Sequence, residues 1–259
     1  MMLGTWGFGG DRNYRLDKMS LKELVRAFFT HYAILVYIVL AVVSILLSYR
    51  FLLSWWQPVV GLVATAIVYP FAEYVLHRFV LHARFMYKTE MTAPVWKRIH
   101  YDHHQNPHDM SVLFGALYTT LPALIGISFP IGWLLAGLSG AFAAIAAAMI
   151  AFTFYEFIHC MQHLPYTPKN NFLRSIKKRH LAHHFHSEQG NFGITSNLWD
   201  RILGTIYESQ RDVPRSPTTF NLGYTAEERE RYPWVAELSA SEAELERRRT
   251  GRGNERTAP

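Results

Sequence analysis

The chain is arranged around the stretch HLAHHFH, which runs from His180 to His186. Its first five residues read His-x-x-His-His, and the same pattern occurs earlier as HYDHH, from His100 to His104. On a helix, positions i, i+3 and i+4 lie on one face, so we expect each triplet to bring three imidazoles to one point. Three converging imidazoles are typical of a metal site.

A histidine pair precedes each triplet. The first pair, HRFVLH, runs from His77 to His82, and the second, HCMQH, runs from His159 to His163. Pair and triplet thus occur twice, about 80 residues apart, and this internal repeat holds ten of the 13 histidines. Burying ten imidazoles without a metal would leave ring nitrogens unsatisfied, so we predict that all ten bind metal. The predicted ligands are His77, His82, His100, His103, His104, His159, His163, His180, His183 and His184.

Three histidines lie outside the repeat. His31 precedes an apolar run, where a lone histidine is usually an interfacial or packed residue. His108 and His186 lie beside the clusters, and we do not count them among the ligands.

Ten nitrogen ligands are too many for one ion. Two ions would share about five nitrogens each, which leaves an open position for water or oxygen on a six-coordinate ion and points to catalysis. Imidazole suits iron, zinc and copper, so the ligand types alone leave the metal open. The single cysteine, Cys160, excludes a disulfide framework and a multi-thiolate zinc site.

Four carboxylates could hold the second ring nitrogens of these histidines, because metal-bound histidines usually donate that N–H to a carboxylate or a carbonyl. Glu156 lies one helical turn before the second pair, and Glu73 lies shortly before the first. Asp102 and Asp200 are further candidates, for which a helix cap or a surface ion pair is the alternative. We predict that Glu156 and Asp200 take part in catalysis.

Hydrophobic residues make up 50% of the chain and concentrate in four runs of a length that favours membrane spans. A turn around Pro58 separates the first two runs, and a turn at Pro130 to Gly132 is expected between the last two. The first and third runs are just long enough, so either could be re-entrant or tilted. The fourth would be about 42 Å long against a hydrocarbon core of about 30 Å, so its histidine end should project from the membrane. The runs cover residues 32–49, 59–76, 112–129 and 131–158.

The distribution of charge predicts the orientation. Arg50 is the only Lys or Arg in the two turns, and the other 25 of the 26 lie before residue 31, between 77 and 110, or after 159. By the positive-inside rule these segments face the cytoplasm, which places both termini and all four histidine clusters on one side. The net charge of +6 is not accompanied by a nucleic-acid-binding motif, so no nucleic-acid partner is expected.

The sequence therefore predicts an all-α integral membrane protein. It should have four transmembrane helices in two hairpins and a cytosolic, histidine-rich helical cap that holds a dimetal centre. We divide the chain into an N-terminal cytosolic or interfacial segment (1–30), a membrane-embedded catalytic domain (31–209) and a charged C-terminal tail (210–259).

The order of the four clusters around two membrane hairpins resembles the fatty acid hydroxylase/sterol desaturase superfamily of membrane di-iron enzymes. EYVLHRFVLH (Glu73 to His82), YEFIHCMQH (Tyr155 to His163) and FGITSNLWDRILGT (Phe192 to Thr205) are most similar to its fatty acid 2-hydroxylase branch. The resemblance covers about residues 60 to 207. It implies a non-haem dimetal centre on the ten histidines and oxygen-dependent hydroxylation of a lipid acyl chain.

The same resemblance implies the cofactors and partners. We expect two iron ions as the metals, although the isolated protein could contain zinc. Dioxygen is the expected co-substrate and a membrane lipid the expected substrate. Eukaryotic 2-hydroxylases often carry a fused haem domain for which these residues leave no room, so a separate cytochrome or ferredoxin should supply electrons. A sterol or carotenoid hydroxylase or desaturase on the same core is the alternative enzyme. A metal transporter is disfavoured, because transport sites usually lie near the bilayer midplane and these histidines lie at or beyond the span ends.

Overall fold

The computed structural model describes residues 14 to 243, and the regular elements in that range are all helices. One isolated bridge, between Arg15 and Asp109, is the exception. The start of the predicted N-terminal segment and the end of the predicted tail lie outside the described residues.

A short helix, α1 (Leu21–Thr30), leads into the long helices. It begins with a capping box, in which the Ser20 hydroxyl accepts the Glu23 N–H and the Glu23 carboxylate accepts the Ser20 N–H. Its buried face includes Phe28, whose ring packs edge-on against Phe157 at a centroid distance of 5.2 Å. This packing joins α1 to the histidine end of the longest helix.

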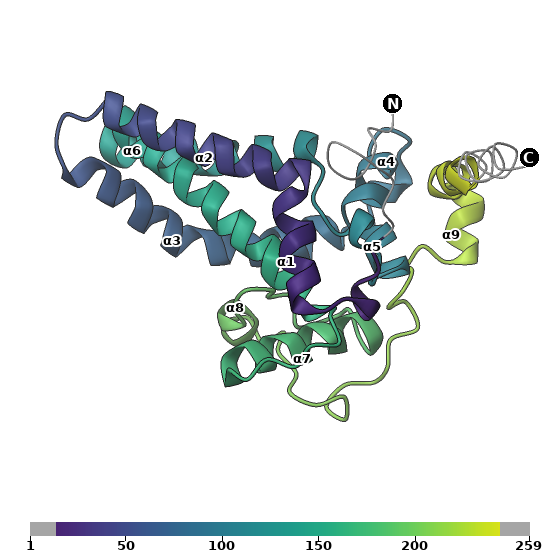
Figure 1. Cartoon of the computed structure of the whole chain (residues 1–259). Coiled ribbons are helices and arrows are strands. Elements are labelled where there is room, and N and C mark those ends of the chain that lie inside the picture. Colours follow the sequence, from purple (N-terminus) through teal and green to yellow (C-terminus); the bar gives the residue numbers. More distant parts are fainter. Residues whose placement is uncertain (1–13, 244–259) are drawn as a thin grey trace, which may run out of the picture.

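Three long helices form the body of the molecule: α2 (Tyr32–Arg50), α3 (Trp56–Leu76) and α6 (Leu117–Gln162). Figure 1 shows them side by side, with the loop between α2 and α3 at one end. Within residues 14–243, three helical stretches are long and apolar enough to cross a membrane, namely α2, the stretch Trp56–Lys88 that contains α3, and α6. Such helices are typical of a membrane protein.

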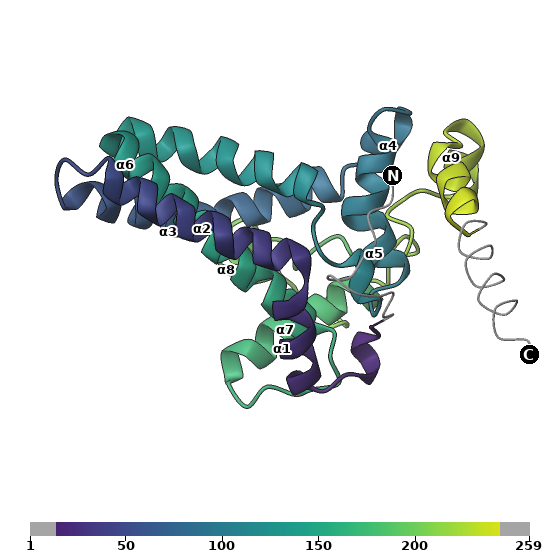
Figure 2. The same cartoon turned by 45° about the horizontal axis from the view of Figure 1, so that its top comes forward.

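The chain reverses within α6. Gly137 has a φ of +65°, in the left-handed region that glycine adopts most readily, and Ala136 is also non-helical. A Cβ on Gly132 would lie 2.5 Å from the carbonyl oxygen of Gly140, so the two arms, 117–135 and 138–162, pack closely beside the reversal. Figure 2 shows α6 doubling back.

This reversal corrects the turn expected at Pro130 to Gly132. Pro130 lies inside the first arm of α6. A proline removes one helical hydrogen bond and can kink a helix, but reversing the chain requires a residue that tolerates positive φ. Gly137 supplies that residue, seven positions further on.

Both turns lie at the same end of the molecule. The Gln57 side chain accepts the backbone N–H groups of Leu53 and Ser54 through Oε1 and donates through Nε2 to the Ala136 carbonyl, at 3.1 Å. Nearby, the Ser48 hydroxyl donates to the Ser139 carbonyl at 2.8 Å. These bonds fix the first turn against the second.

Short helices gather at the opposite end of the long helices and form the cap (Figure 1). One set follows α3, and a second follows α6 and comprises α7 (Asn171–Phe185) and α8 (Leu198–Ile202). The first set comprises the π-helical turns η3 (His77–Leu81) and η5 (Lys97–Tyr101), the 3-10 turns η4 (Met86–Lys88) and η6 (Met110–Val112), and the helices α4 (Ala93–Trp96) and α5 (Asp102–Gln105). A 3-10 turn, η2 (Leu16–Lys18), precedes α1.

The segment after residue 209, where a charged tail is expected, is partly helical as far as residue 243. It contains α9 (Ala226–Arg231) and helical residues 234 to 243. Tyr224 and Val235 are buried against the aromatic side chains of Tyr87 and Trp96. Apolar residues spaced among the charged ones provide this second core. The domain boundary at 209 remains a prediction.

Candidate metal centre

All ten histidines of the repeat converge in the cap, in two adjacent groups. Site A contains five buried histidines whose ligand atoms lie within 4.8 Å of one another. Site B contains four histidines that meet the same criterion, and His104 joins them because its Nε2 lies 3.1 Å from that of His100. Site A consists of His103, His159, His163, His180 and His184. Site B consists of His77, His82, His100, His104 and His183.

The middle histidine of each triplet crosses to the site of the other half. His103 belongs to the first triplet but lies in site A, and His183 belongs to the second but lies in site B. Each triplet is therefore divided, which corrects the expectation that its three imidazoles meet at one point. The reason is helix geometry, because position i+3 lies about 100° from position i+4 and about 60° from position i, on the opposite side.

A π-helical turn aligns the first histidine pair. His77 and His82 are five residues apart, a spacing that an α-helix places on different faces. In η3 the His82 N–H donates to the His77 carbonyl, the i to i+5 pattern of a π-turn, and the two Nε2 atoms lie 3.2 Å apart. The second pair, His159 and His163, is spaced by four and needs only the ordinary α-helix of α6.

Backbone carbonyls orient three of the five rings in site B. His77, His104 and His183 each present Nδ1 to a carbonyl oxygen. A neutral imidazole has one proton, so an Nδ1–H that donates to a carbonyl leaves Nε2 as an exposed lone pair. The three carbonyls belong to Phe192 at 2.5 Å, Thr219 at 2.8 Å and Gly190 at 2.8 Å, in the same order.

The nitrogen separations in site B fit a bound cation. Neighbouring Nε2 atoms lie 3.0 to 3.2 Å apart. Lone pairs facing one another at this distance repel, and a cation between them removes the repulsion. Nitrogens about 2.1 Å from one ion are about 3.0 Å apart at right angles and about 3.4 Å apart in a tetrahedron. The spacing therefore fits the right angles of a five- or six-coordinate ion.

Site A fits a metal for a different reason. The Nδ1 atoms of all five rings, and Nε2 of His103, His159 and His184, are buried without a hydrogen-bond partner among residues 14–243. Burial, reinforced by the neighbouring imidazoles, holds the pKa of His103, His180 and His184 well below the usual histidine value. These rings are thus neutral at physiological pH, which is the form that binds metal.

None of the four candidate carboxylates hydrogen-bonds to a repeat histidine within the described range. Asp102 instead pairs with the buried Lys97 at 2.8 Å. Glu156 accepts the Gly115 N–H at 2.9 Å, and its other oxygen has no partner in the described part of the chain. The sequence suggested carboxylate partners, and the structure uses backbone carbonyls, which have no signature in the residue types.

Asp200 and Glu73 hold the loop that supplies two of those carbonyls. The two oxygens of the fully buried Asp200 accept the N–H groups of Phe192 and Gly193, at 2.9 and 2.7 Å. Glu73 accepts the N–H groups of the next two residues, Ile194 and Thr195, at 2.7 and 2.9 Å. Both acids thus contact the histidines only through the loop.

A cavity of about 270 Å³ lies between α3 and both arms of α6. His77 and His100 of site B and His103 and His159 of site A line its cap end. Its lining continues along α3 as far as Thr65, which is about 18 Å from His77 at about 1.5 Å per residue. The cavity therefore joins both sites to the apolar interior of the long helices.

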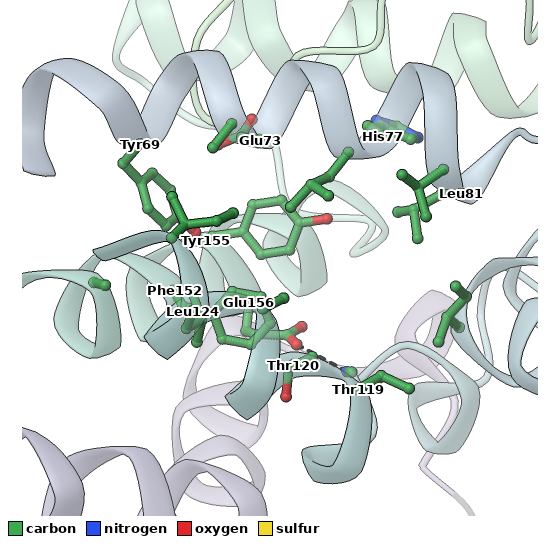
Figure 3. A pocket seen from close by; sticks show the side chains of 18 of the residues that line it. Tyr69, Glu73, His77, Leu81, Thr119, Thr120, Leu124, Phe152, Tyr155 and Glu156 are labelled. Carbon is green, nitrogen blue, oxygen red and sulfur yellow. Dashed lines mark hydrogen bonds between the residues drawn. The ribbon is translucent and has the colours of Figure 1, made fainter. Parts of the chain in front are cut away.

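Most of the cavity wall is apolar, with a few polar groups near the cap. Figure 3 shows Tyr69 and Glu73 on one side, facing Tyr155 on the other, with Glu156 nearby.

The remaining histidines lie outside both sites. His31 is buried and its ring stacks on Phe114 at 4.1 Å, as expected of a packed residue. His186 bonds through Nε2 to the Val213 carbonyl at 2.9 Å. His108 stacks on Phe185 and lies beside His163, with ring centroids 6.0 Å apart.

Long apolar helices that end in two buried five-histidine groups, joined by an apolar cavity, define a membrane protein with a candidate dimetal centre. The model of the fatty acid hydroxylase family matches residues 62 to 205, more than half of the chain. The chain therefore belongs to the fatty acid hydroxylase family.

The curated relatives that the chain resembles include 2-hydroxylases. The chain is 34% identical to a dihydroceramide fatty acyl 2-hydroxylase of Arabidopsis thaliana, over 54% of this chain and 57% of the relative. It is 28% identical to the fatty acid 2-hydroxylase of Rattus norvegicus, over 56% and 39% respectively. The matches thus span between about two fifths and three fifths of these relatives, and they confirm the resemblance to the 2-hydroxylase branch.

A solved structure shares the fold. The hydroxylase domain of full-length scs7p matches with a TM-score of 0.59 and 24% identity, over 78% of this chain and 71% of that one.

Proposed function

We propose that the chain is a membrane-bound, oxygen-dependent hydroxylase that uses two iron ions to hydroxylate carbon 2 of a lipid acyl chain. The observation that carries the proposal is the cavity, because it joins histidines of both sites to the apolar space between α3 and α6. An acyl chain that enters this space would place its first carbons beside both metal positions and leave its tail among apolar side chains.

Two iron ions bound at sites A and B would supply the redox chemistry needed to use dioxygen on an unactivated C–H bond. The protein contributes ligands and their positions. Neutral imidazoles are available in both sites, and the carbonyls of Gly190, Phe192 and Thr219 fix the ring orientations in site B. In this proposal Asp200 positions the loop that carries the Gly190 and Phe192 carbonyls. Glu156 contacts the substrate from the cavity wall.

The choice of carbon 2 is supported by the relatives, whose names describe fatty acid and dihydroceramide fatty acyl 2-hydroxylases. Fatty acids and sphingolipids are therefore the proposed substrate class. Hydroxylation with dioxygen also needs two electrons per turnover, and we propose that a separate cytochrome or ferredoxin delivers them.

The proposal includes four membrane crossings, by α2, α3 and the two arms of α6. The reversal at Gly137 and its bond to the first turn through Gln57 support this count, because they place both turns at one end of the bundle. Arg50 is the only Lys or Arg in the two turns, so the cap with both metal sites and both termini would face the cytoplasm.

Lipid profiling tests the function. A host that expresses the chain with a competent reductase should accumulate an acyl lipid heavier by about 16 mass units, with the hydroxyl at carbon 2, because one oxygen atom is inserted. The variant His183→Ala, which removes a site B ligand, should abolish the product, and the matched variant His186→Ala should retain it. A sterol or carotenoid product, or a loss of two mass units, would contradict the proposed activity.

A further inference from the structure

The two sites are held by different means. In site B, three rings donate from Nδ1 to backbone carbonyls, so their orientations are set by the fold. In site A, no Nδ1 has a partner in the described residues. The side chains of site A therefore lack the hydrogen bonds that would fix the tautomer and orientation of each ring before an ion arrives.

Two of the three site B carbonyls, those of Gly190 and Phe192, belong to one loop that is fixed by several hydrogen bonds. Asn191 connects this loop to the segment after α8, because its side chain donates to the Tyr207 carbonyl and accepts the Tyr207 N–H, both at 3.1 Å. The Asp200 carboxylate fixes the next two residues and also accepts the Thr205 hydroxyl at 2.7 Å. A Cβ on Gly193 would lie 2.9 Å from Asp200 Oδ2, so only glycine allows this approach.

Asp200 therefore acts on the histidines indirectly, through the loop. It holds Phe192, whose carbonyl accepts from His77, in a loop whose Gly190 carbonyl accepts from His183. Both of these histidines are in site B, and no hydrogen bond in the described range links Asp200 or its loop to a ring of site A.

We propose that the two metal positions have unequal affinities, that site B binds first and more tightly, and that Asp200 is the positioning residue that sets the difference. The inference rests on the proposed two-metal function. Its physical basis is twofold. Pre-oriented rings lose less conformational freedom when they bind a metal, and a ring whose Nδ1–H donates to a carbonyl has a more basic Nε2. Changes to such supporting groups typically alter metal affinity about 10- to 100-fold.

The test is a titration of the purified, metal-free chain in detergent with Co²⁺ alone, followed by calorimetry and by the visible absorption of the bound ion. The wild-type chain should bind two ions in two separated steps. Repulsion between neighbouring cations would separate the steps as well, so variants must assign them. His183→Ala should weaken the tight step, and His103→Ala should weaken the loose one.

Asp200→Asn is the decisive variant, because it replaces an acceptor of a backbone N–H by a donor while it keeps the side-chain shape. It should weaken the tight step about 10- to 100-fold and leave the loose step unchanged. Thr205→Val, which removes only the hydroxyl bonded to Asp200, should act in the same direction more mildly and serves if the first variant does not fold. Asp109→Asn is the matched control, since Asp109 caps η6 and bonds neither site.

Three results would overturn the inference: two equal steps in the wild type, equal weakening of both steps by Asp200→Asn, or a tight step that survives His183→Ala. The titration does not depend on turnover. Two separated binding steps without a hydroxylated lipid product would support the inference and contradict the proposed function. Two equal binding steps in a chain that does hydroxylate lipid would support the proposed function and contradict the inference.

Discussion

Filling the far end of the cavity should shorten the acyl chains that the protein accepts. Ala148 is buried on the second arm of α6 and lines the cavity. It lies 11 positions before His159, which is about 16 Å along the helix at about 1.5 Å per residue. Replacing Ala148 by leucine would add three carbons at the point that a long acyl tail would occupy.

The magnitude follows from steric exclusion and not from hydrophobic transfer. A lipid tail enters the cavity from hydrocarbon and not from water, so burying its last methylenes adds little free energy. Forcing extra methylenes into an occupied apolar site typically costs about 1 to 3 kcal/mol. Since each 1.36 kcal/mol is about tenfold, Ala148→Leu should reduce kcat/KM for chains that reach residue 148 by about 5- to 150-fold relative to shorter chains.

The assay is competition within a mixture of acyl lipids that differ only in chain length, with product ratios read by mass spectrometry. Ala147→Leu is the control, because Ala147 is adjacent and chemically identical but does not line the cavity. Thermal unfolding of both variants checks that the fold is retained. An unchanged product profile in Ala148→Leu, or the same shift in Ala147→Leu, would refute the assignment of the cavity to the acyl tail.

Four further predictions follow from the sites and the topology. Alanine at any of the ten repeat histidines should lower the metal content below two per chain and abolish turnover, whereas alanine at His31, His108 or His186 should not; one metal per wild-type chain would contradict this. Glu156→Gln should keep both metals and lower turnover, because Glu156 lines the cavity and bonds to no repeat histidine within the described range; unchanged turnover would exclude a role for Glu156. The metal-free protein should lose stability as the pH falls below about 6.5, by up to about 1.4 kcal/mol per pH unit for each histidine that stays neutral when folded. The sign follows because burial lowers the pKa of His103, His180 and His184 in the folded state, so only the unfolded chain takes up protons there; a denaturation midpoint that rises on acidification would contradict it. Tags before Met1 and after Pro259 should both be protected from external protease in intact cells, and tags on opposite faces would exclude four crossings.

The histidine repeat was sufficient to predict that ten histidines meet, because helical spacing and an internal repeat are both readable from one sequence. It could not predict the exchange of His103 and His183 between sites, because the direction of a side chain beyond its own helix depends on how the helices pack. The five-residue spacing of His77 and His82 did contain information, since it fits a π-turn better than an α-turn.

Other features had weaker signatures. The turn was predicted at Pro130 because proline often ends a helix, but the chain reverses at Gly137, the glycine that adopts positive φ. The apolar residues Tyr224 and Val235 are sparse among charged neighbours, so their packing against Tyr87 and Trp96 was not predicted. The carbonyls that orient the site B rings belong to the backbone, so the residue types in the sequence cannot predict them.

The exchange of middle histidines also has a mechanical consequence. His183 and His82 are 101 residues apart in sequence, and one ion bound by both would cross-link these two parts of the chain. Closing a loop of about 100 residues removes unfolded-state entropy worth about 4.7 kcal/mol when a disulfide does it. With Cys160 as its only cysteine, the chain has no intramolecular disulfide. Each ion in the centre would instead fasten the N-terminal hairpin to the C-terminal one.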